Sequence, residues 1–434
     1  MKDALDRFFD ITRLGSTIRI EVLAGFSTFL SLSYIFVVNP AILSEAGMDK
    51  SPVLFATILA SALATLVMGL WARLPFALST GLEMNAYVAF VAVQGLGFTW
   101  QEGLGLVFWS GVVFMILTLL RVRKSIITAI PVPMKSTLSL SVGFFLVLIA
   151  AKLSGVLTFD GLYVSGIGDL FSPTAIALYI GGALVFLFSA VKIRAAVLLS
   201  IIGSALYCNI VGATDLTPPA ETGPHMLSAI GAVDLSVIAR PAAISGIIIL
   251  FLVDFYGSIA KFIGLTMQTS IVDQSTGQVP RTKQALSVDG VATMVGATLG
   301  TSSVTTFVES GVGIGAGGRT GLTAVTCSIF MLLCFFIVPL LAYVPVAATT
   351  GALVFVGIKL MPSRATFSAY DGFAKLAAIA MPAIVVFSFS LEKAMLAGFL
   401  IYIVRDMAQK RRPNPYVAAS AAALAIGVAL QAAN

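Results

Sequence analysis

The sequence predicts an all-α polytopic membrane protein, and three observations support that fold class. Of the 434 residues, 58% are hydrophobic and 11% are charged, whereas soluble domains carry about 25% charged residues. Apolar runs of roughly 17–25 residues recur along the chain, and this is the length that crosses a bilayer as a helix. The basic residues also fall mainly between alternate runs, as expected when loops face the cytoplasm.

The first segment, 1–19, carries charges throughout and lacks the apolar run that precedes a signal-peptide cleavage site. Its apolar positions are typical of an amphipathic helix on the membrane surface, namely Leu5, Phe8, Phe9, Ile11 and Leu14. We therefore expect a cytoplasmic N-terminal segment that lies against the membrane.

Fourteen apolar runs follow this segment and predict fourteen transmembrane spans. They cover 20–38, 52–72, 76–95, 102–120, 133–152, 173–190, 195–213, 242–265, 285–299, 302–316, 321–343, 346–361, 372–389 and 391–407. With the N-terminus in the cytoplasm, 21 of the 26 Lys and Arg residues fall on that side, four fall outside, and Lys261 lies within a span. This bias follows the positive-inside rule and predicts a multi-pass protein of the cell inner (plasma) membrane. The run 416–433 is either a fifteenth span or a packed or interfacial helix.

Spans three and ten are irregular. Span three contains STGLEMNAYVAF (79–90), and span ten contains TSSVTTFVESGVGIGAGG (301–318). Exposed backbone at membrane depth is tolerated only where protein buries it or where it lines a cavity. We therefore predict half-helices in both spans that meet at a site.

The two irregular spans hold matching positions, because each is the third of seven. A second pair supports this register: IPVPMKSTLSLSVG (130–143) opens span five, and VPVAATTGALVFVG (344–357) opens span twelve. Since seven is odd, the second half must be inverted relative to the first. A 7+7 inverted repeat with broken helices in corresponding places is typical of transporters with a site at the midplane.

Five ionisable residues lie deep within the predicted spans: Glu83, Asp254, Lys261, Asp289 and Glu309. Such residues indicate function by default, although each can instead be a buried packing residue. Asp289 is equally compatible with a structural cap. Lys261 lies about two turns beyond Asp254, and we favour snorkelling toward the cytoplasm over an internal ion pair.

Other sequence features exclude several classes of chemistry. The single His225 and three scattered cysteines offer no metal-ligand spacing, and the glycine run 311–321 has no alternating strands and helices around it to form a dinucleotide site. Phe307 and Tyr87 lie beside the irregular turns, where they either stack on a planar ligand or pack in the core. Carboxylates, hydroxyls such as that of Thr306 and an aromatic face suit a planar heterocycle with ring N–H groups. Buried carboxylates also favour protonation, which suits proton coupling.

Five segments carry a resemblance to a known family. They are TIRIEVLAGFSTFLSLSYIFVVNPAIL (17–43), GLEMNAYVAF (81–90), FLVDFYGS (251–258), ALSVDGVAT (285–293) and GTSSVTTFVESGVGIGAGGRTGLTAV (300–325). Together they resemble the azaguanine–hypoxanthine permease group, the guanine/hypoxanthine/adenine branch of the nucleobase–cation symporters. The resemblance implies the uracil-permease fold and a purine base carrier that is usually proton-coupled. It also implies an elevator-type movement of a core domain (20–121 and 241–343) against a gate domain (122–240 and 344–412), followed by an apolar segment, 413–434.

The resemblance also assigns site residues. Asp254 and Glu309 would hold the N–H edges of the purine, and Asn85 would orient the core near the site. Phe307, Thr306 and Ser258 complete the predicted substrate-binding set. Asp254, Asp289, Glu309 and Glu83 are the candidates for proton coupling.

Three positions depart from the family's pattern. Glu83 stands where the family usually has Gly, Gly257 stands where it has a second Asp, and Ala260-Lys261 replaces Gly-Thr. One hypothesis is that Glu83 replaces the missing acid and carries the coupling proton. Alternatively, Glu83 is a neutral, hydrogen-bonded packing residue.

Rival functions remain at this stage. The first is an anion carrier on the same fold, which the two acids Asp254 and Glu309 argue against. A pyrimidine carrier on the same fold is a further alternative. A membrane enzyme would need a nucleophile–base pair or a metal cluster, and a sensor would need an added soluble domain. We expect no metal, no cofactor and no nucleic acid partner, and a homodimer is compatible with the sequence.

The Glu83 hypothesis makes a direct prediction. Glu83→Gln should leave purine binding intact and abolish its pH dependence, because the amide keeps the shape but cannot take up the proton. Proton-driven uptake that is unchanged in this variant would contradict the hypothesis.

Overall fold

The structure is a computed structural model that describes residues 2–120, 132–161, 163–213, 224–266, 271, 281–338 and 344–432. The elements of its first half are α1 (Lys2–Phe9), α2 (Ile18–Leu32), α3 (Ile35–Ser44), α4 (Lys50–Val67), η1 (Met68–Ala72), β1 (Leu78–Thr80), α5 (Leu82–Ala86), η2 (Tyr87–Gly95), α6 (Trp100–Leu119), α8 (Val132–Leu153), β2 (Leu157–Asp160), β3 (Tyr163–Ile167), α9 (Pro173–Ala190) and α10 (Ala196–Val211). Those of its second half are η3 (Pro224–Leu227), η4 (Leu235–Ala239), α11 (Pro241–Thr266), α12 (Thr282–Leu299), β4 (Val304–Thr306), α13 (Ser310–Gly315), α14 (Gly321–Leu333), η5 (Cys334–Ile337), α16 (Val346–Lys359), α17 (Arg364–Ser368), α18 (Gly372–Ser388), α19 (Leu391–Ala408) and α20 (Pro415–Ala432).

The chain is predominantly helical, and each predicted span range contains one or more of these elements. Within the described ranges, six helical stretches are long and apolar enough to cross a membrane: Ile18–Ser44, Lys50–Ala72, Trp100–Leu119, Ser136–Leu153, Pro173–Ala190 and Pro241–Ser258. The count of fourteen spans stays a prediction.

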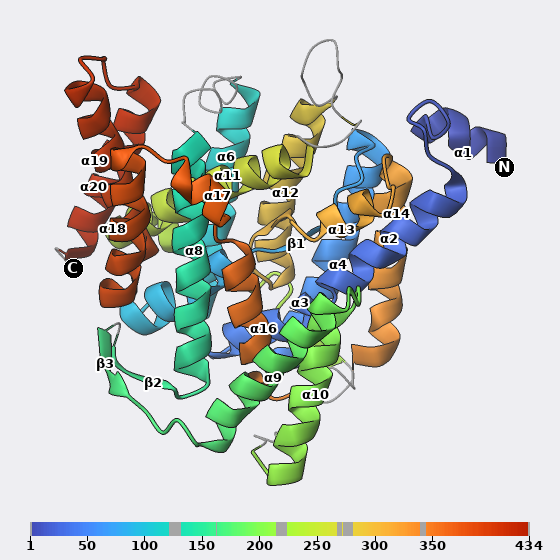
Figure 1. Cartoon of the computed structure of the whole chain (residues 1–434), viewed down its shortest axis with the longest axis horizontal. Coiled ribbons are helices and arrows are strands. Elements are labelled where there is room, and N and C mark those ends of the chain that lie inside the picture. Colours follow the sequence, from blue (N-terminus) through green and yellow to red (C-terminus); the bar gives the residue numbers. More distant parts are fainter. Residues whose placement is uncertain are drawn as a thin grey trace.

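The two irregular stretches meet in the middle of the molecule as an antiparallel pair, β1 with β4 (Figure 1). Ser79 faces Thr305 in the register, and all six strand residues are buried. The pairing continues beyond both strands, since Gly81 N–H donates to Ser303 O at 3.0 Å and Phe307 N–H donates to Ala77 O at 2.9 Å. Each extended segment therefore satisfies the backbone groups that the other would otherwise leave unpaired in an apolar interior.

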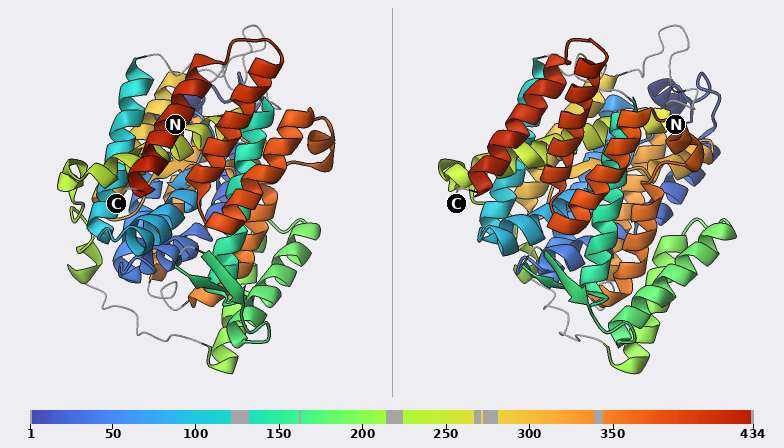
Figure 2. Two further views of the ribbon diagram at one scale, coloured as in Figure 1. Left: turned by 90° about the vertical axis from the view of Figure 1, so that its left-hand side faces the viewer. Right: turned by 60° about the vertical axis from the view of Figure 1, so that its left-hand side comes forward.

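The helices surround this pair in two groups. Helices α2, α4, α13 and α14 lie together at one side of Figure 1, and α18, α19 and α20 lie at the opposite side. Helix α8 packs against α16, α18 and α19, and α16 also packs against α9. Helices α9 and α10 form a hairpin at one end of the molecule, beside the two-stranded β2–β3 sheet (Figure 2).

Equivalent positions of the two predicted repeats contact each other. Helices α8 and α16 begin at Val132 and Val346, which occupy the same place in the two aligned segments of the sequence. A Cβ on Gly143 would lie 2.4 Å from Gly357 O, and a Cβ on Gly357 would lie 2.5 Å from Gly143 O. Since these glycines are also equivalent in the alignment, the two helices cross reciprocally at a point where backbone touches backbone.

An aromatic cluster closes the space between η2, α8, β2 and the end of α18. The ring of Phe389 lies 6.0 Å from Phe90, 5.1 Å from Phe145 and 5.2 Å from Phe159, measured between centroids. The ammonium of Lys152 lies 4.5 Å above the Phe90 ring, and its Nζ donates to Gln94 Oε1 at 3.1 Å. Cation–π contact of this kind stabilises a half-buried amine.

The two terminal segments both pack on the helical body. Phe9 and Ile11 are buried against Leu322 of α14. Helix α20 packs against α11 and α19, and the hydroxyls of Ser420 and Tyr256 lie 2.6 Å apart. Both a fifteenth span and a packed helix at 416–433 match these contacts.

Gly143→Ala should destabilise the fold, because its methyl group would meet the backbone of Gly357 in the α8–α16 crossing. Overpacking of this kind typically lowers the free energy of unfolding by about 1–3 kcal/mol. Thermal unfolding of the purified protein in detergent measures this as a lower melting temperature.

Gly182→Ala in α9 is the matched control, because a Cβ there would meet nothing within 4 Å. Alanine favours helix over glycine, so this variant should be neutral or slightly stabilised. Equal melting temperatures for the two variants would contradict the close crossing of α8 and α16.

Candidate functional site

A cavity of about 150 Å³ lies between the two groups of helices, beside the β1–β4 pair. A cavity of about this size can hold a single six-membered aromatic ring. The ionisable side chains that line the cavity lie on one side of it: Tyr34, Glu83, Tyr256, Lys261 and Glu309. The opposite wall is contributed by α8, α16 and α19 and is apolar except for Ser139; its members are Leu138, Ser139, Val142, Leu146, Val356, Leu360, Leu391 and Met395.

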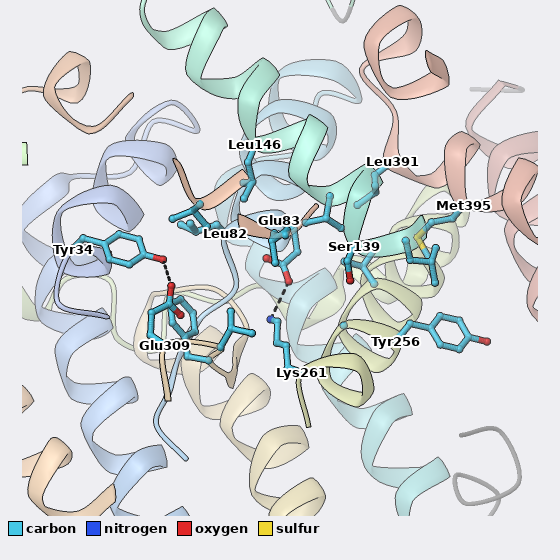
Figure 3. Close-up of a pocket in the computed structure, with 18 residues that line it drawn as sticks. Tyr34, Leu82, Glu83, Ser139, Leu146, Tyr256, Lys261, Glu309, Leu391 and Met395 are labelled. Carbon is cyan, nitrogen blue, oxygen red and sulfur yellow. Dashed lines mark hydrogen bonds and ion pairs between the residues drawn. The ribbon is translucent and has the colours of Figure 1, made fainter. Parts of the chain in front are cut away.

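Glu309 and Tyr34 point toward one another on this wall (Figure 3). Glu309 lies three residues after β4 and directly before α13, whereas Tyr34 lies at the junction of α2 and α3. Tyr34 Oη donates to Glu309 Oε1 at 2.8 Å, and Glu309 Oε2 has no hydrogen-bond partner among the described residues. One oxygen is thus held in place while the other can accept a hydrogen bond from a ligand.

Lys261 does not snorkel, so the favoured interpretation of this residue is wrong. Its Nζ donates to Glu83 Oε1 at 3.2 Å inside the cavity wall, and the side chains of Lys261 and Glu83 are 13% and 10% exposed (Figure 3). Helix α11 continues to Thr266, so position 261 lies too far within it to reach its end. The Glu83 carboxylate, which is nearer than the end of the helix, therefore compensates the desolvation of the Lys261 ammonium.

Gly257 lies next to this ion pair. A Cβ built on Gly257 would lie 3.7 Å from Glu83 Oε1, which is ordinary van der Waals contact. The Glu83 carboxylate therefore occupies the space toward which a side chain at position 257 would point. Glu83 and Gly257, two of the departures from the pattern that the resemblance implies, therefore lie side by side in the structure.

The remaining acids lie behind the cavity wall and hold β4 in place. Asp289 accepts from Thr306 N–H at 2.8 Å and from the Thr306 hydroxyl at 3.1 Å. Asp254 accepts from Thr293 at 3.1 Å and from Ser258 at 3.3 Å. Asp289 does not cap its own helix, which begins seven residues earlier at Thr282; it caps the strand instead.

Ser258 and Thr306 belong to the same buried network, since the Ser258 hydroxyl lies 2.7 Å from that of Thr305. Neither these two side chains nor the carboxylates of Asp254 and Asp289 line the cavity. Phe307, the next residue after β4, does line it.

Asn85 lies in a second buried network. Its amide donates to Asn39 Oδ1, and the Asn39 amide donates to Thr57 at 2.6 Å and Thr301 at 2.9 Å. This chain of bonds joins α5, α3, α4 and the segment before β4. Asn85 is fully buried and does not line the cavity.

A larger cavity of about 480 Å³ adjoins the first and shares Val308, Glu309, Val356 and Leu360 with it. Its walls carry Lys192, Arg194 and Lys359, all on the side that the charge bias predicts to be cytoplasmic. Glu309 is therefore reached both from the ring-sized cavity and from this vestibule.

Sequence reasoning did not identify two of the wall residues. Tyr34 stands within LSLSYIFVVNP, and its only signal is a hydroxyl-bearing aromatic in the middle of an apolar span. Tyr256 lies two residues beyond Asp254 and reaches the wall because α11 runs along the cavity. The apolar wall of α8, α16 and α19 carries no signal that separates it from other core positions.

The donor set suits a neutral ring rather than a metal ion. No group of three or more potential metal ligands occurs among the described residues. Two carboxylates, one ammonium, three hydroxyl-bearing side chains and the phenyl ring of Phe307 line a ring-sized space. Such a wall can bind a planar heterocycle by hydrogen bonds at its edge and by apolar contact on its faces.

Comparison with known proteins agrees with the sequence-based resemblance. The chain is 36% identical over 408 residues to "Adenine permease AdeP" of Escherichia coli (strain K12), covering 94% of this chain and 91% of that protein. It is 31% identical over 414 residues to "Guanine/hypoxanthine permease PbuO" of Bacillus subtilis (strain 168), covering 91% and 93%. In solved structures, the transmembrane domain of the cyanobacterial bicarbonate transporter BicA has a TM-score of 0.66 at 13% identity, covering 87% of this chain and 96% of that one. The inward-facing murine anion transporter Slc26a9 has a TM-score of 0.64 at 12% identity, covering 90% and 68%.

The structural likenesses establish a helical transporter fold and nothing about the substrate, because their sequence identity is low. Residues 19–389 match the Permease family. The predicted resemblance to adenine and guanine/hypoxanthine permeases is confirmed. The chain is therefore an integral membrane protein that belongs to this family of permeases, and it is a transporter rather than an enzyme.

Proposed function

We propose that this permease carries purine nucleobases, as the names of its relatives indicate for them, through the ring-sized cavity between its two groups of helices. The observation that carries this proposal is Glu309, whose Oε1 is fixed by Tyr34 while Oε2 is left without a described partner beside Phe307. A purine ring has N–H groups at its edge and an apolar face. Glu309 accepts the N–H, and Phe307 contacts the ring.

The other predicted site residues receive supporting roles in this proposal. Asp254, Asp289, Ser258 and Thr306 hold β4 and so fix the position of Phe307 and Glu309. Asn85 ties the start of span three to three neighbouring segments, which is the orienting role that the resemblance implies. Side chains locked by such contacts are what a preorganised site requires.

We further propose the fourteen-span architecture with two inverted seven-span repeats, half-helices in spans three and ten, and core and gate domains. The antiparallel β1–β4 pair and the reciprocal contact of Gly143 with Gly357 support it, since both join equivalent parts of the two repeats. All charged groups of the cavity lie on the proposed core, and the proposed gate offers an apolar wall. An apolar wall of this kind can slide past a bound base without breaking polar contacts, as an elevator-type movement needs.

The proposal includes proton symport. Glu309, and not Glu83 as one hypothesis from the sequence had it, carries the coupling proton. Glu309 faces both cavities and has an oxygen available for a proton, whereas Glu83 is already paired with Lys261. The charge bias of the loops supports a plasma-membrane protein with a cytoplasmic N-terminus.

Purine uptake into proteoliposomes should be observed for the wild-type chain and should increase when the outside is made acidic. Adenine, guanine and hypoxanthine are the test substrates, and uracil, bicarbonate and chloride separate the rival carriers on the same fold. Uptake of an anion with no purine uptake under any gradient would overturn the proposed function.

Glu309→Gln should reduce purine uptake by about 100-fold or more, because the amide still fills the site but cannot carry the proton or act as a charged acceptor. Glu392→Gln is the matched control. Glu392 is buried, also has an oxygen without a described partner, and does not line the cavity. Equal losses in the two variants would indicate a general effect of removing a buried carboxylate.

Tyr34→Phe should weaken purine binding by about tenfold, since hydrogen bonds to charged groups contribute about 1.5–3 kcal/mol. Equilibrium binding of labelled base to the purified protein measures the change. Tyr370→Phe is the control, because the buried Tyr370 hydroxyl lies outside the cavity and has no partner among the described residues. Unchanged binding in Tyr34→Phe would show that Glu309 does not depend on this bond.

A further inference from the structure

We propose that Lys261 is a resident cation of the transport site. Its ammonium permanently compensates the Glu83 carboxylate, so this acid needs neither a proton nor a metal ion from solution when a base occupies the cavity. The inference rests on the proposed purine transport through the same cavity. It adds which group compensates the charge of the Glu83 carboxylate during transport.

The geometry of the pair is the first support. Lys261 Nζ lies 3.2 Å from Glu83 Oε1, and both side chains stand on the cavity wall with little exposure. They come from α11 and α5, two elements that contact each other on the proposed core. The pair therefore moves as one body with the site and need not break during transport.

The partners of the neighbouring acids are the second support. Asp289 is bonded to Thr306, Asp254 to Thr293 and Ser258, and Glu309 to Tyr34, whereas the partner of Glu83 is Lys261. The charges that face Lys261 are Glu83, Asp254, Asp289 and Glu309. Its ammonium therefore lies among acids, and it is bonded directly to Glu83, to which no hydroxyl donates among the described residues.

The energetics of burial explain why such a cation is needed. A buried carboxylate without a partner is strongly destabilising, as the removal of one member of a buried ion pair shows. A neutral purine that covers Glu83 supplies no charge. Compensation must therefore come from the solution or from the protein, and here the protein supplies it.

The sequence departures form a consistent set around this pair. Gly257 and Lys261 lie four residues apart on one face of α11, and Glu83 reaches the space beside Gly257. An acid at position 257 would bring a second carboxylate against Glu83. The chain instead combines one carboxylate with one fixed ammonium at this place.

The test compares Lys261→Met with the double variant Glu83→Gln/Lys261→Met. At pH 8 the single variant should bind purine at least about tenfold more weakly than wild type at the same pH, because Glu83 is left charged and unpaired. At pH 6 it should recover, since a proton then replaces the ammonium. The double variant removes both charges, so it should bind purine better than Lys261→Met at pH 8 and should show no recovery when the pH is lowered to 6.

Thermal unfolding without purine gives a readout that is independent of transport. Lys261→Met should melt at a lower temperature at pH 8 than at pH 6, relative to wild type, and the double variant should not. This comparison holds even if the chain carries another substrate, so a failure of the proposed function is distinguished from a failure of the inference.

Three results would overturn the proposal. If the double variant is no better than Lys261→Met, Lys261 acts by contacting the base directly. If Lys261→Met has the same purine affinity and the same melting temperature as wild type at pH 8, Lys261 does not compensate the charge of Glu83. If Glu83→Gln alone removes the pH dependence of wild-type uptake, Glu83 carries the coupling proton and is not held by Lys261.

Discussion

The antiparallel pairing of β1 with β4 is the constraint on which the rest of the structure depends. Two chain segments that leave helical geometry at the centre of a membrane protein expose N–H and C=O groups, and these groups must find partners there. They find them in each other, with Gly81 and Phe307 extending the ladder at its two ends. The cavity residues Glu83 and Glu309 follow the two strands closely in sequence, so the same pairing that satisfies the backbone also brings the acids to one site.

The buried acids divide into two layers with different physical roles. Asp254 and Asp289 accept hydrogen bonds from hydroxyl and backbone donors behind β4, and neither residue lines the cavity. Glu83 and Glu309 face the cavity, where one is balanced by an ammonium and the other keeps an oxygen available. A site that must bind and release a neutral ring benefits from this division, because the costly desolvation of charge is completed before the ring arrives.

Much of the fold was predictable because bilayer crossing leaves strong patterns. Apolar length, loop charge and the irregular spans three and ten predicted where helices and breaks lie, and the two aligned segments open the helices α8 and α16 at equivalent residues. Side-chain direction was not predictable in the same way. Lys261 was expected to reach solvent because its spacing from Asp254 says nothing about a carboxylate that arrives from α5, 178 positions away in the sequence.

The candidate site was predictable in part for the same reason. Glu309 and Phe307 could be predicted as site residues because they lie in a polar, glycine-rich stretch. Tyr34 reaches Glu309 across 275 positions, and nothing local marks it. The apolar wall of α8, α16 and α19 is also invisible in sequence, because a residue that lines a cavity and one that packs in a core have the same composition.

The aromatic cluster around Lys152 gives the molecule two unequal ends. The β2–β3 end and the turn that carries Lys192 and Arg194 flank α9, whose 18 residues span about 27 Å. At the end that carries Lys192 and Arg194, the vestibule adjoins the cavity. At the β2–β3 end, the rings of Phe90 and Phe389 pack together. Aromatic pairs contribute about 0.5–1.5 kcal/mol each, so the three pairs of Phe389, with Lys152 over the rings of Phe90, Phe159 and Phe389, amount to a few kcal/mol. Opening this end would require breaking these contacts together, whereas the vestibule end is already hollow.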